Sequence, residues 1–259
     1  MLCADFIYRQ NPVALLTSGS VLCYNNIMKI EAVIFDLDGT LLNTLDDLTA
    51  AVNHALNAFG LRSLDLNTVR RYVGNGVPKL IERALYYATT GKEPDLENGK
   101  FEDRALFNSC LAVFTEYYNA HNADRTAPYA GVSEMLAAVK AAGLKTAVVT
   151  NKYDGAAQAL KSVFFKNIDL VVGARDGIRP KPAPDGVYKA LELLHADVKR
   201  AVYVGDGETD MLTAKNCGMP VIAVTWGFRD ESVLRTFGPD HIVDTPSALA
   251  DTLKRLSVE

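Results

Sequence analysis

This 259-residue sequence lacks the features that mark several classes of protein. Its four cysteines lie far apart, with no CxxC pair and no histidine at metal-ligand spacing. We therefore expect neither a structural zinc site nor a disulfide framework. No uninterrupted apolar run approaches the roughly 20 residues that a membrane-spanning helix needs. These absences favour a protein of the reducing cytoplasm that has no membrane partner.

Basic residues are not concentrated anywhere along the chain. The formal net charge is −4, and no block is rich in lysine and arginine, which argues against a nucleic-acid partner bound mainly through phosphates. Apolar residues make up 49% of the sequence and charged residues 22%, a balance that allows one large buried core or two modest ones. We therefore expect an ordinary globular protein that acts on a small molecule.

Residues 1–27 precede the first regular pattern in the sequence. They contain Pro12 and a mixed polar run, and they lack the positive, apolar and small-residue order of a secretory signal. Met28 stands directly before the first strong strand pattern. We interpret residues 1–27 as an N-terminal extension, either an artefact of the assigned start site or a disordered arm.

Short apolar runs rich in β-branched residues recur after Met28. Most of them are continuous rather than alternating, which is typical of strands covered on both faces. Helix-length stretches lie between the later runs, at 132–142, 154–164, 184–194, 208–216 and 246–256. This alternation predicts a Rossmann-like α/β core, in which a parallel sheet carries helices on both faces. The predicted strands are 30–35, 145–150, 168–172, 200–204, 220–224 and 241–243.

A long segment without a buried strand pattern interrupts this alternation after the first strand. Within it, apolar residues recur at spacings of three and four over 45–59 and 101–118, which predicts helices. We therefore expect a small all-helical domain at 44–127, inserted into an α/β catalytic core formed by 28–43 and 128–259. The chain crosses between the two domains twice, so the two links can act as a hinge.

Polar side chains lie beyond the ends of several predicted strands. Ligands of open parallel sheets bind outside the carboxyl ends of the strands, so we expect these side chains to meet at one edge. Taken singly, an Asp or a Thr there could equally cap a helix or form a turn, and a Lys could be a solvated loop charge. The residues are Asp36, Asp38, Thr150, Asn151, Lys181, Asp206 and Asp210.

Four acidic side chains at one edge raise one another's pKa values unless a cation compensates their charge. Because all the candidate ligands are oxygens, they favour a hard ion, and a loose site with few protein ligands suits Mg²⁺. Such an ion coordinates a phosphate of the substrate. Thr150, the backbone amide of Asn151 and the Lys181 ammonium would bind the phosphoryl oxygens. We therefore expect Mg²⁺ and a small phosphorylated metabolite at this edge.

The order of these residues resembles the haloacid dehalogenase (HAD) superfamily. That superfamily's four motifs match Asp36-x-Asp38-Gly-Thr, Thr150, Lys181 and Gly205-Asp206-x-x-x-Asp210, and the helical insert is similar to its small cap domain. The resemblance implies that Asp36 is the nucleophile, forming an aspartyl-phosphate, and that Asp38 is the general acid and then the general base. It also implies that the Asp36 and Asp206 carboxylates and the Asp38 backbone carbonyl hold Mg²⁺, with Asp210 in or near the shell.

Asp38 separates the branches of this superfamily. Dehalogenase members lack an acid at this position, and phosphonate-cleaving members replace it, so the resemblance implies phosphate-ester chemistry. Gly39 is expected to permit a tight turn beneath the phosphate. A sugar-phosphate mutase would share every core residue, but the basic cap segment of mutases is not recognisable here. A phospho-accepting signalling receiver fits poorly, because its accepting Asp follows a middle strand and its chain is much shorter.

Substrate specificity depends on the helical insert. Its segment RRYVGNGVPKL at 70–80 has two glycines that allow close backbone approach, although a plain turn between helices is an equal interpretation. Arg70, Arg71 and Lys79 are candidate partners for an anion. Together with DLDGTLLNT and GDGETD, the VGNG run resembles bacterial phosphoglycolate phosphatases, which implies hydrolysis of 2-phosphoglycolate to glycolate and phosphate. Related enzymes act on pyrophosphate, nucleoside monophosphates or sugar phosphates, and the motifs do not separate them. Whether the protein is a monomer or a homodimer is left open.

Overall fold

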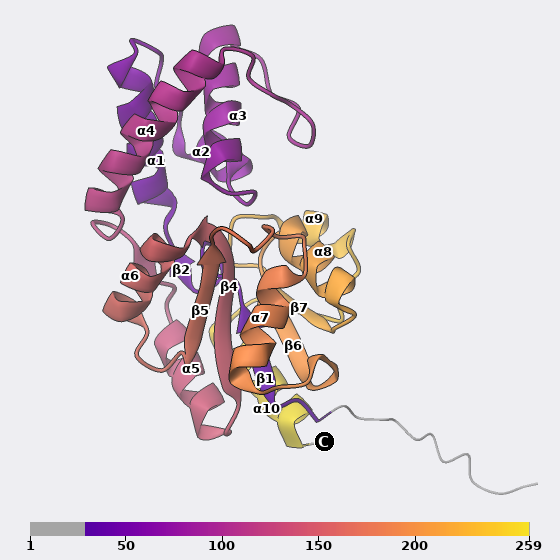
Figure 1. The fold of residues 1–259 in the computed structure, drawn as a ribbon. Coiled ribbons are helices and arrows are strands. Elements are labelled where there is room, and N and C mark those ends of the chain that lie inside the picture. The colour runs from indigo at the N-terminus through magenta and orange to yellow at the C-terminus, as the bar shows by residue number, and fades with distance from the viewer. Residues whose placement is uncertain (1–28, 259) are drawn as a thin grey trace, which may run out of the picture.

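The computed structural model describes residues 29–258, and a six-stranded sheet forms its centre (Figure 1). All neighbouring strands of this sheet run parallel. Each of the six predicted strands is present, so the predicted parallel sheet is confirmed. The interpretation of residues 1–27 lies outside the described residues. In sheet order the strands are β5 (Leu170–Ala174), β4 (Lys145–Tyr153), β1 (Ala32–Phe35), β6 (Ala201–Gly205), β7 (Val221–Val224) and β8 (His241–Val243).

Helices cover both faces of the sheet, because its strands are apolar on both sides. In β1, Val33 and Phe35 pack on one face, while Ala32 and Ile34 pack on the other. The first face is covered by α5 (Val132–Ala141), α6 (Asp154–Phe164) and α10 (Pro246–Val258). The second face is covered by α7 (Asp185–Leu194), α8 (Glu208–Cys217) and the short α9 (Glu231–Arg235). The predicted Rossmann-like α/β core is therefore confirmed.

Between β1 and β4 lies the helical insert, residues 45–121, which is called the cap below. Its core is a cluster separate from those of the sheet and includes Val52, Ile81, Leu85 and Phe114. The predicted all-helical insert is confirmed, whereas its bounds of 44 and 127 stay a prediction. Among the described helices, none combines the length and the apolarity that a bilayer crossing requires. The cap helices are α1 (Leu45–Ala58), α2 (Leu66–Tyr72), α3 (Val77–Thr90) and α4 (Arg104–His121).

The cap segment 70–80 is more regular than the sequence indicates. Helix α2 begins after Asp65, whose carboxylate accepts a hydrogen bond from the Thr68 amide (3.0 Å) and so caps the helix. Helix α3 begins after Gly76 with Pro78 in its first turn, where the amide that proline lacks would have no partner within the helix. Only residues 73–76, the VGNG run, are non-helical, so this part of the segment is a short turn between two helices.

The two chain crossings between core and cap lie side by side. β2 (Leu42–Asn43) pairs antiparallel with β3 (Ala127–Pro128), a pairing too short to recognise in the sequence. The Asp47 carboxylate of α1 accepts hydrogen bonds from the Arg125 amide (3.0 and 3.1 Å) and from the amide and hydroxyl of Thr126 (2.9 and 2.8 Å). The two crossings are therefore tied together, and a hinge at this point stays a prediction.

Candidate active site

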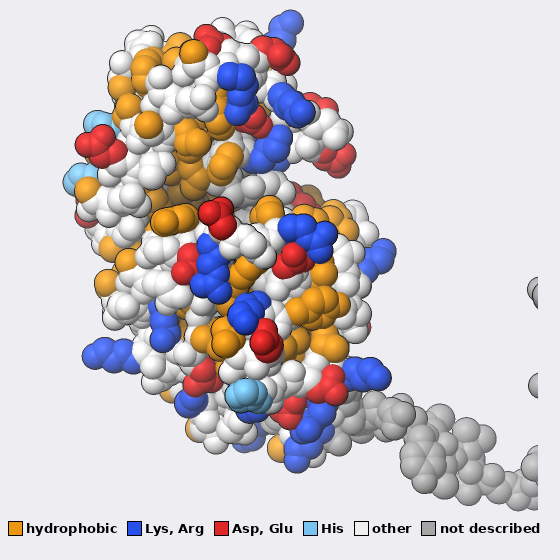
Figure 2. Space-filling view, viewed as in Figure 1, with side chains coloured by type: hydrophobic (Ala, Val, Ile, Leu, Met, Phe, Trp, Pro, Cys, Tyr) orange, Lys and Arg blue, Asp and Glu red, His pale blue; other side chains and the backbone are white. Residues whose placement is uncertain are grey.

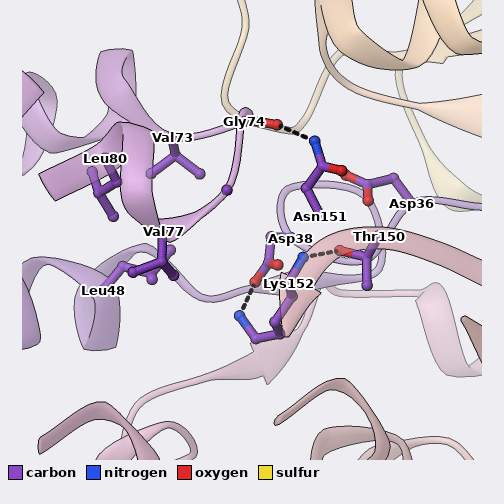
Figure 3. Close-up of a pocket in the computed structure, with 11 residues that line it drawn as sticks. Asp36, Asp38, Leu48, Val73, Gly74, Val77, Leu80, Thr150, Asn151 and Lys152 are labelled. Carbon is purple, nitrogen blue, oxygen red and sulfur yellow. Dashed lines mark hydrogen bonds and ion pairs between the residues drawn. The ribbon is translucent and has the colours of Figure 1, made fainter. Parts of the chain in front are cut away.

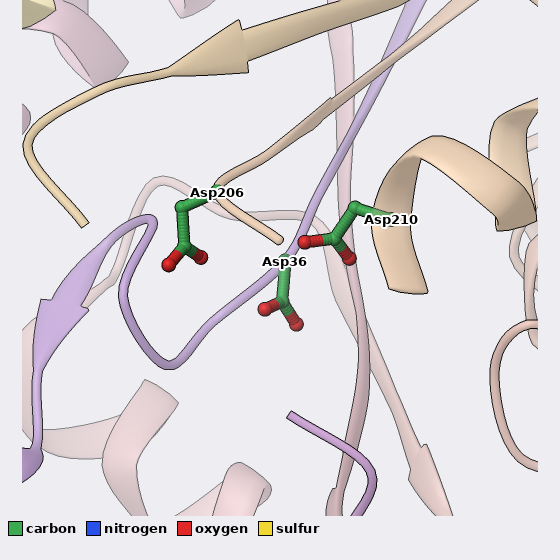
Figure 4. A group of neighbouring side chains, drawn as sticks. All are labelled: Asp36, Asp206 and Asp210. Atoms are coloured by element: carbon green, nitrogen blue, oxygen red, sulfur yellow. The ribbon is translucent and has the colours of Figure 1, made fainter. Parts of the chain in front are cut away.

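The carboxyl ends of the central strands face the cap, and three acidic side chains gather there (Figure 1, Figure 4). Asp36 follows β1, Asp206 follows β6, and Asp210 lies in the first turn of α8. One carboxylate oxygen from each residue lies within 4.8 Å of one from each of the other two. The structure thus brings these three predicted site residues together from segments far apart in the sequence.

The Lys181 ammonium lies between two of these carboxylates. Its Nζ is 2.7 Å from Oδ1 of Asp36 and 2.7 Å from Oδ1 of Asp210. It also contacts the hydroxyl of Tyr203, on β6, at 3.1 Å. All of these groups are buried. Lys181 contacts two of the three clustered carboxylates, and no salt bridge within residues 29–258 reaches the third, Asp206, which leaves an excess of negative charge in a buried place.

This excess charge makes the carboxylates hard to ionise. Burial, together with the charges of Asp210 and Asp206, raises the pKa of Asp36 to about 8, although Lys181 opposes the shift. Burial and then the charge of Asp210 raise the pKa of Asp206 to about 7. An all-oxygen donor set with uncompensated negative charge fits a hard divalent cation. These three residues could therefore hold a metal ion.

Two glycines make room for the Asp206 carboxylate. Gly39 has a φ of +93°, and a Cβ at this position would lie 2.3 Å from Oδ2 of Asp206. A Cβ at Gly227 would lie 2.4 Å from the same oxygen. Thr40 Oγ1 (2.9 Å) and the Phe228 amide (2.7 Å) donate to this carboxylate and hold it in place. A side chain at either glycine would displace Asp206, so close approach adds to the reason for glycine in the turn at residue 39.

A small cavity lies between the carboxylate cluster and the cap (Figure 3). Its volume is about 50 Å³, enough for a few water molecules. Asp36 and Asp38 line its core side, together with Thr150, Asn151 and Lys152 from the end of β4. Figure 2 shows hydrophobic side chains at the waist between the cap and the core. The side chains that line the cap side of the cavity are all apolar: Leu48, Val73, Val77 and Leu80.

Asn151 is hydrogen-bonded to Lys181, and Thr150 is hydrogen-bonded to Lys152. Thr150 Oγ1 accepts a hydrogen bond from the Lys152 amide at 3.1 Å. Asn151 Oδ1 accepts one from the Lys181 amide (2.7 Å), and its Nδ2 donates to the Lys181 carbonyl (3.1 Å) and the Gly74 carbonyl (3.3 Å). The structure therefore brings the three residues predicted to bind phosphate to the same place as Asp36. Their role stays a prediction.

Lys152 is the site residue that the sequence argument did not assign. Its side chain is 4% exposed, and its Nζ donates to Oδ1 of Asp38 (2.8 Å) and to the hydroxyl of Tyr118, on α4 (2.8 Å). Burial alone would lower the pKa of Lys152, but the Asp38 carboxylate outweighs burial and holds the pKa above its ordinary value. Thr44 Oγ1 donates to the same Asp38 oxygen (2.7 Å). The only signal in the sequence was the position of Lys152 beside Thr150 at a strand end.

The basic cap residues named as candidate anion partners pair with acidic side chains instead. Arg70 pairs with Asp230 (3.3 Å), Arg71 with Glu93 (2.9 Å) and Lys79 with Glu82 (3.0 Å). None of these three cations is among the described residues that line the cavity. Their charges are used in ion pairs in this structure, and their role as partners for an anion stays a prediction.

The fold and the site together define the class of protein. A parallel-sheet core, a carboxylate cluster at its strand ends and an inserted helical cap are what the resemblance to the HAD superfamily implies. The family model described as haloacid dehalogenase-like hydrolase matches residues 33–224, and the chain belongs to this family. The predicted family and its hydrolase class are therefore confirmed.

Two bacterial proteins named phosphoglycolate phosphatase are similar to this chain over most of their length. The chain is 34% identical to a phosphoglycolate phosphatase of Mesorhizobium japonicum, over 86% of this chain and 94% of that protein. It is 37% identical to a phosphoglycolate phosphatase of Caulobacter vibrioides, over 83% of this chain and 89% of that protein.

Two solved structures also resemble this chain over most of its length. One from Lactobacillus delbrueckii subsp. bulgaricus, provisionally named phosphoglycolate phosphatase, has a TM-score of 0.83 and 35% identity, covering 87% of this chain and 99% of that one. CbbY of Rhodobacter sphaeroides, solved in complex with phosphate, has a TM-score of 0.66 and 25% identity, covering 85% of this chain and 96% of that one.

Proposed function

We propose that this protein is a Mg²⁺-dependent phosphatase that hydrolyses 2-phosphoglycolate to glycolate and phosphate. One observation carries the proposal. Asp36 and Asp38 line one small cavity at the strand ends, and the Lys181 ammonium donates a hydrogen bond to Asp36. The names of the relatives in Mesorhizobium and Caulobacter support the choice of substrate.

Asp36 has the surroundings of a nucleophile. Its Oδ1 accepts a hydrogen bond from Lys181, and no hydrogen bond from residues 29–258 reaches its Oδ2. In the proposed first step this oxygen bonds to phosphorus while the ester P–O bond breaks, and the leaving oxygen takes a proton from Asp38. In the second step Asp38 takes a proton from water, whose oxygen bonds to phosphorus. Phosphate then leaves, and the Asp36 carboxylate is restored.

The metal and the phosphate would be held by different residues. The carboxylates of Asp36 and Asp206 and the backbone carbonyl of Asp38 would bind Mg²⁺, and Asp210, which belongs to the same cluster, would lie in or beside the shell. The ion would offset the charge of the carboxylates and that of the phosphoryl oxygens. Thr150, the Asn151 amide and the Lys181 ammonium would donate to the phosphoryl oxygens, where charge develops in the transition state.

The cavity favours a small substrate over the alternatives within the family. The cavity holds only about 50 Å³, so a sugar phosphate or a nucleotide would need the cap to open further than 2-phosphoglycolate would. Among the described residues that line this cavity, none from the cap is a basic side chain that could hold the second phosphate of a mutase intermediate. Pyrophosphate is the small rival substrate. A signalling receiver has no counterpart to the cap. A cytoplasmic location without nucleic-acid or membrane partners stays a prediction.

The test is phosphate release by the purified protein with Mg²⁺ or with EDTA. The substrates are 2-phosphoglycolate, pyrophosphate, a nucleoside monophosphate and glucose 1-phosphate, with Asp36→Asn as the inactive control. We expect kcat/KM for 2-phosphoglycolate to exceed the others at least tenfold and Asp38→Ala to abolish turnover. Preference for another ester would refute the substrate but keep the mechanism, whereas near-normal turnover by Asp38→Ala would refute its acid–base role.

A further inference from the structure

We propose that the Lys152 ammonium binds the carboxylate of the substrate and so selects carboxylated phosphate esters. This inference rests on the proposed phosphatase function and adds a specificity residue to it. No motif used to recognise the family contains Lys152, and its role follows from three observations: its place in the cavity, its unused hydrogen-bonding capacity, and its distance from Asp38.

Lys152 is the only cation among the described residues that line the cavity. The charged side chains around it there are Asp36 and Asp38, and the cap side is apolar. The Lys181 ammonium already donates hydrogen bonds to Asp36 and Asp210. A carboxylate that left water for this cavity without a charged partner would carry a large desolvation cost. Lys152 is therefore the group that can accept a second anionic centre of the substrate.

The ammonium has hydrogen-bonding capacity to spare. It carries three N–H donors, and within residues 29–258 it meets two acceptors, Oδ1 of Asp38 and the hydroxyl of Tyr118. One donor is left for a ligand. Tyr118 and Asp38 hold Nζ from two sides, so little side-chain entropy is lost when that third donor meets an oxygen.

The distance to Asp38 indicates where the substrate's carboxylate must be. Asp38 is proposed to donate its proton to the ester oxygen, and Nζ of Lys152 is 2.8 Å from Oδ1 of Asp38. Hydrogen bonds to oxygen span about 2.7–3.2 Å, so groups that contact Asp38 and Lys152 must be close neighbours on the substrate. A carboxylate on the carbon that bears the ester oxygen meets this condition. The inferred substrate class is therefore phosphate esters of 2-hydroxy acids.

The test compares 2-phosphoglycolate with ethyl phosphate, in which a methyl group replaces the carboxylate. Wild type, Lys152→Met and Lys152→Arg are assayed on both esters, and the ratio of kcat/KM values cancels any loss common to both. We expect Lys152→Met to reduce the preference for 2-phosphoglycolate by about 100-fold, mainly through KM, because a buried charge pair is lost. Lys152→Arg, which keeps the charge, is expected to retain part of the preference.

Lys189→Met is the matched control. The Lys189 ammonium pairs with Glu192 on α7 (2.9 Å) and does not line the cavity, so the preference ratio is expected to stay at the wild-type value. Circular dichroism verifies folding, and Lys152→Gln replaces Lys152→Met if the latter does not fold. An equal loss on both esters in the Lys152 variants would overturn the inference and leave Lys152 as a residue that positions Asp38. A wild-type enzyme without preference for 2-phosphoglycolate would instead refute the proposed substrate itself.

Discussion

The pKa values of buried acidic side chains shift in opposite directions in the cap and in the core. In the cap, Glu82 pairs with two cations, Lys79 (3.0 Å) and Arg104 (2.7 Å). Burial alone would raise the pKa of Glu82, but these two pairs outweigh it and lower the pKa. In the core, Lys181 contacts two of three clustered carboxylates, and the pKa of Asp36 rises to about 8.

The difference indicates what each set of charges does. The cap completes its charge pairs with its own side chains, so these pairs contribute to the stability of the free protein. The core site leaves its negative charge uncompensated, a cost that a cation and a phosphate can relieve on binding. Changes to the charges of the cap should therefore affect stability, and changes to the charges of the core site should affect activity.

The largest expected effect is on activity at the core site. Asp36→Asn keeps the shape of the side chain but removes the nucleophilic oxygen, so kcat should fall about 10⁴-fold or more. The matched variant in the cap, Glu82→Gln, should keep kcat within a few-fold. Initial rates of phosphate release on 2-phosphoglycolate measure both. A large loss of kcat in Glu82→Gln, with the protein still folded, would contradict the assignment of the cap ion pairs to stability alone.

Removing the metal is the next largest effect. EDTA should lower kcat/KM by about 100-fold or more, because charge stabilisation by a divalent ion contributes several kcal/mol. Mg²⁺ should also raise the melting temperature of the EDTA-treated protein, since binding to the folded state alone stabilises it. Asp206→Asn should abolish that rise, whereas Glu82→Gln should keep it. A melting temperature indifferent to Mg²⁺ in the wild type would contradict a metal site at the three carboxylates.

A smaller effect is expected where the core holds the cap. Arg229 donates to the carbonyls of Arg70 (3.1 Å) and Val73 (2.6 Å) and pairs with Glu208 (2.7 Å). Arg229→Ala should raise KM about tenfold with little change in kcat, because bonds to a charged donor that close the cap are lost. The control is Arg235→Ala, since within residues 29–258 the salt bridge of Arg235 is with Glu231 of its own helix. Equal KM values for the two variants would show that these contacts do not hold the cap closed.

The smallest expected effects concern stability against pH, and they have opposite signs in the two regions. The folded pKa of Glu82 is lowered, so its contribution of about 1 kcal/mol is present above its unfolded pKa and is lost as pH falls through the folded value. Asp36 has a raised pKa, so the metal-free folded protein holds a proton that the unfolded chain has lost. Stability should therefore fall as pH rises from about 4 to about 8.

Denaturant unfolding in EDTA across this pH range measures both effects. Relative to wild type, Glu82→Gln should be less stable at pH 7 and equal in stability at acid pH. Asp36→Asn should remove part of the decline in stability between pH 4 and pH 8. The same sign of pH dependence for both variants would mean that the two regions do not differ in the proposed way.

Most of the core could be predicted because its pattern is local. Short apolar runs, most of them continuous, identified all six strands, and the core helices followed from the helix-length stretches between the strands. Elements that are short, such as β2, β3 and α2, have too few residues for a period to emerge, and they were missed.

The amino-acid sequence alone determined which chemical groups reach the site, because parallel strands end at one edge, Asp36 and Asp206 follow two of them, and Thr150 lies near the end of a third. Only the tertiary structure decided which cation meets which carboxylate. Lys152 contacts Asp38 across 114 positions of sequence, and Lys181 contacts Asp36 across 145. The ion pairs of the basic cap residues could not be predicted for the same reason. Charge pairing depends on side-chain reach and burial in the folded chain, and neither has a local signature in the sequence.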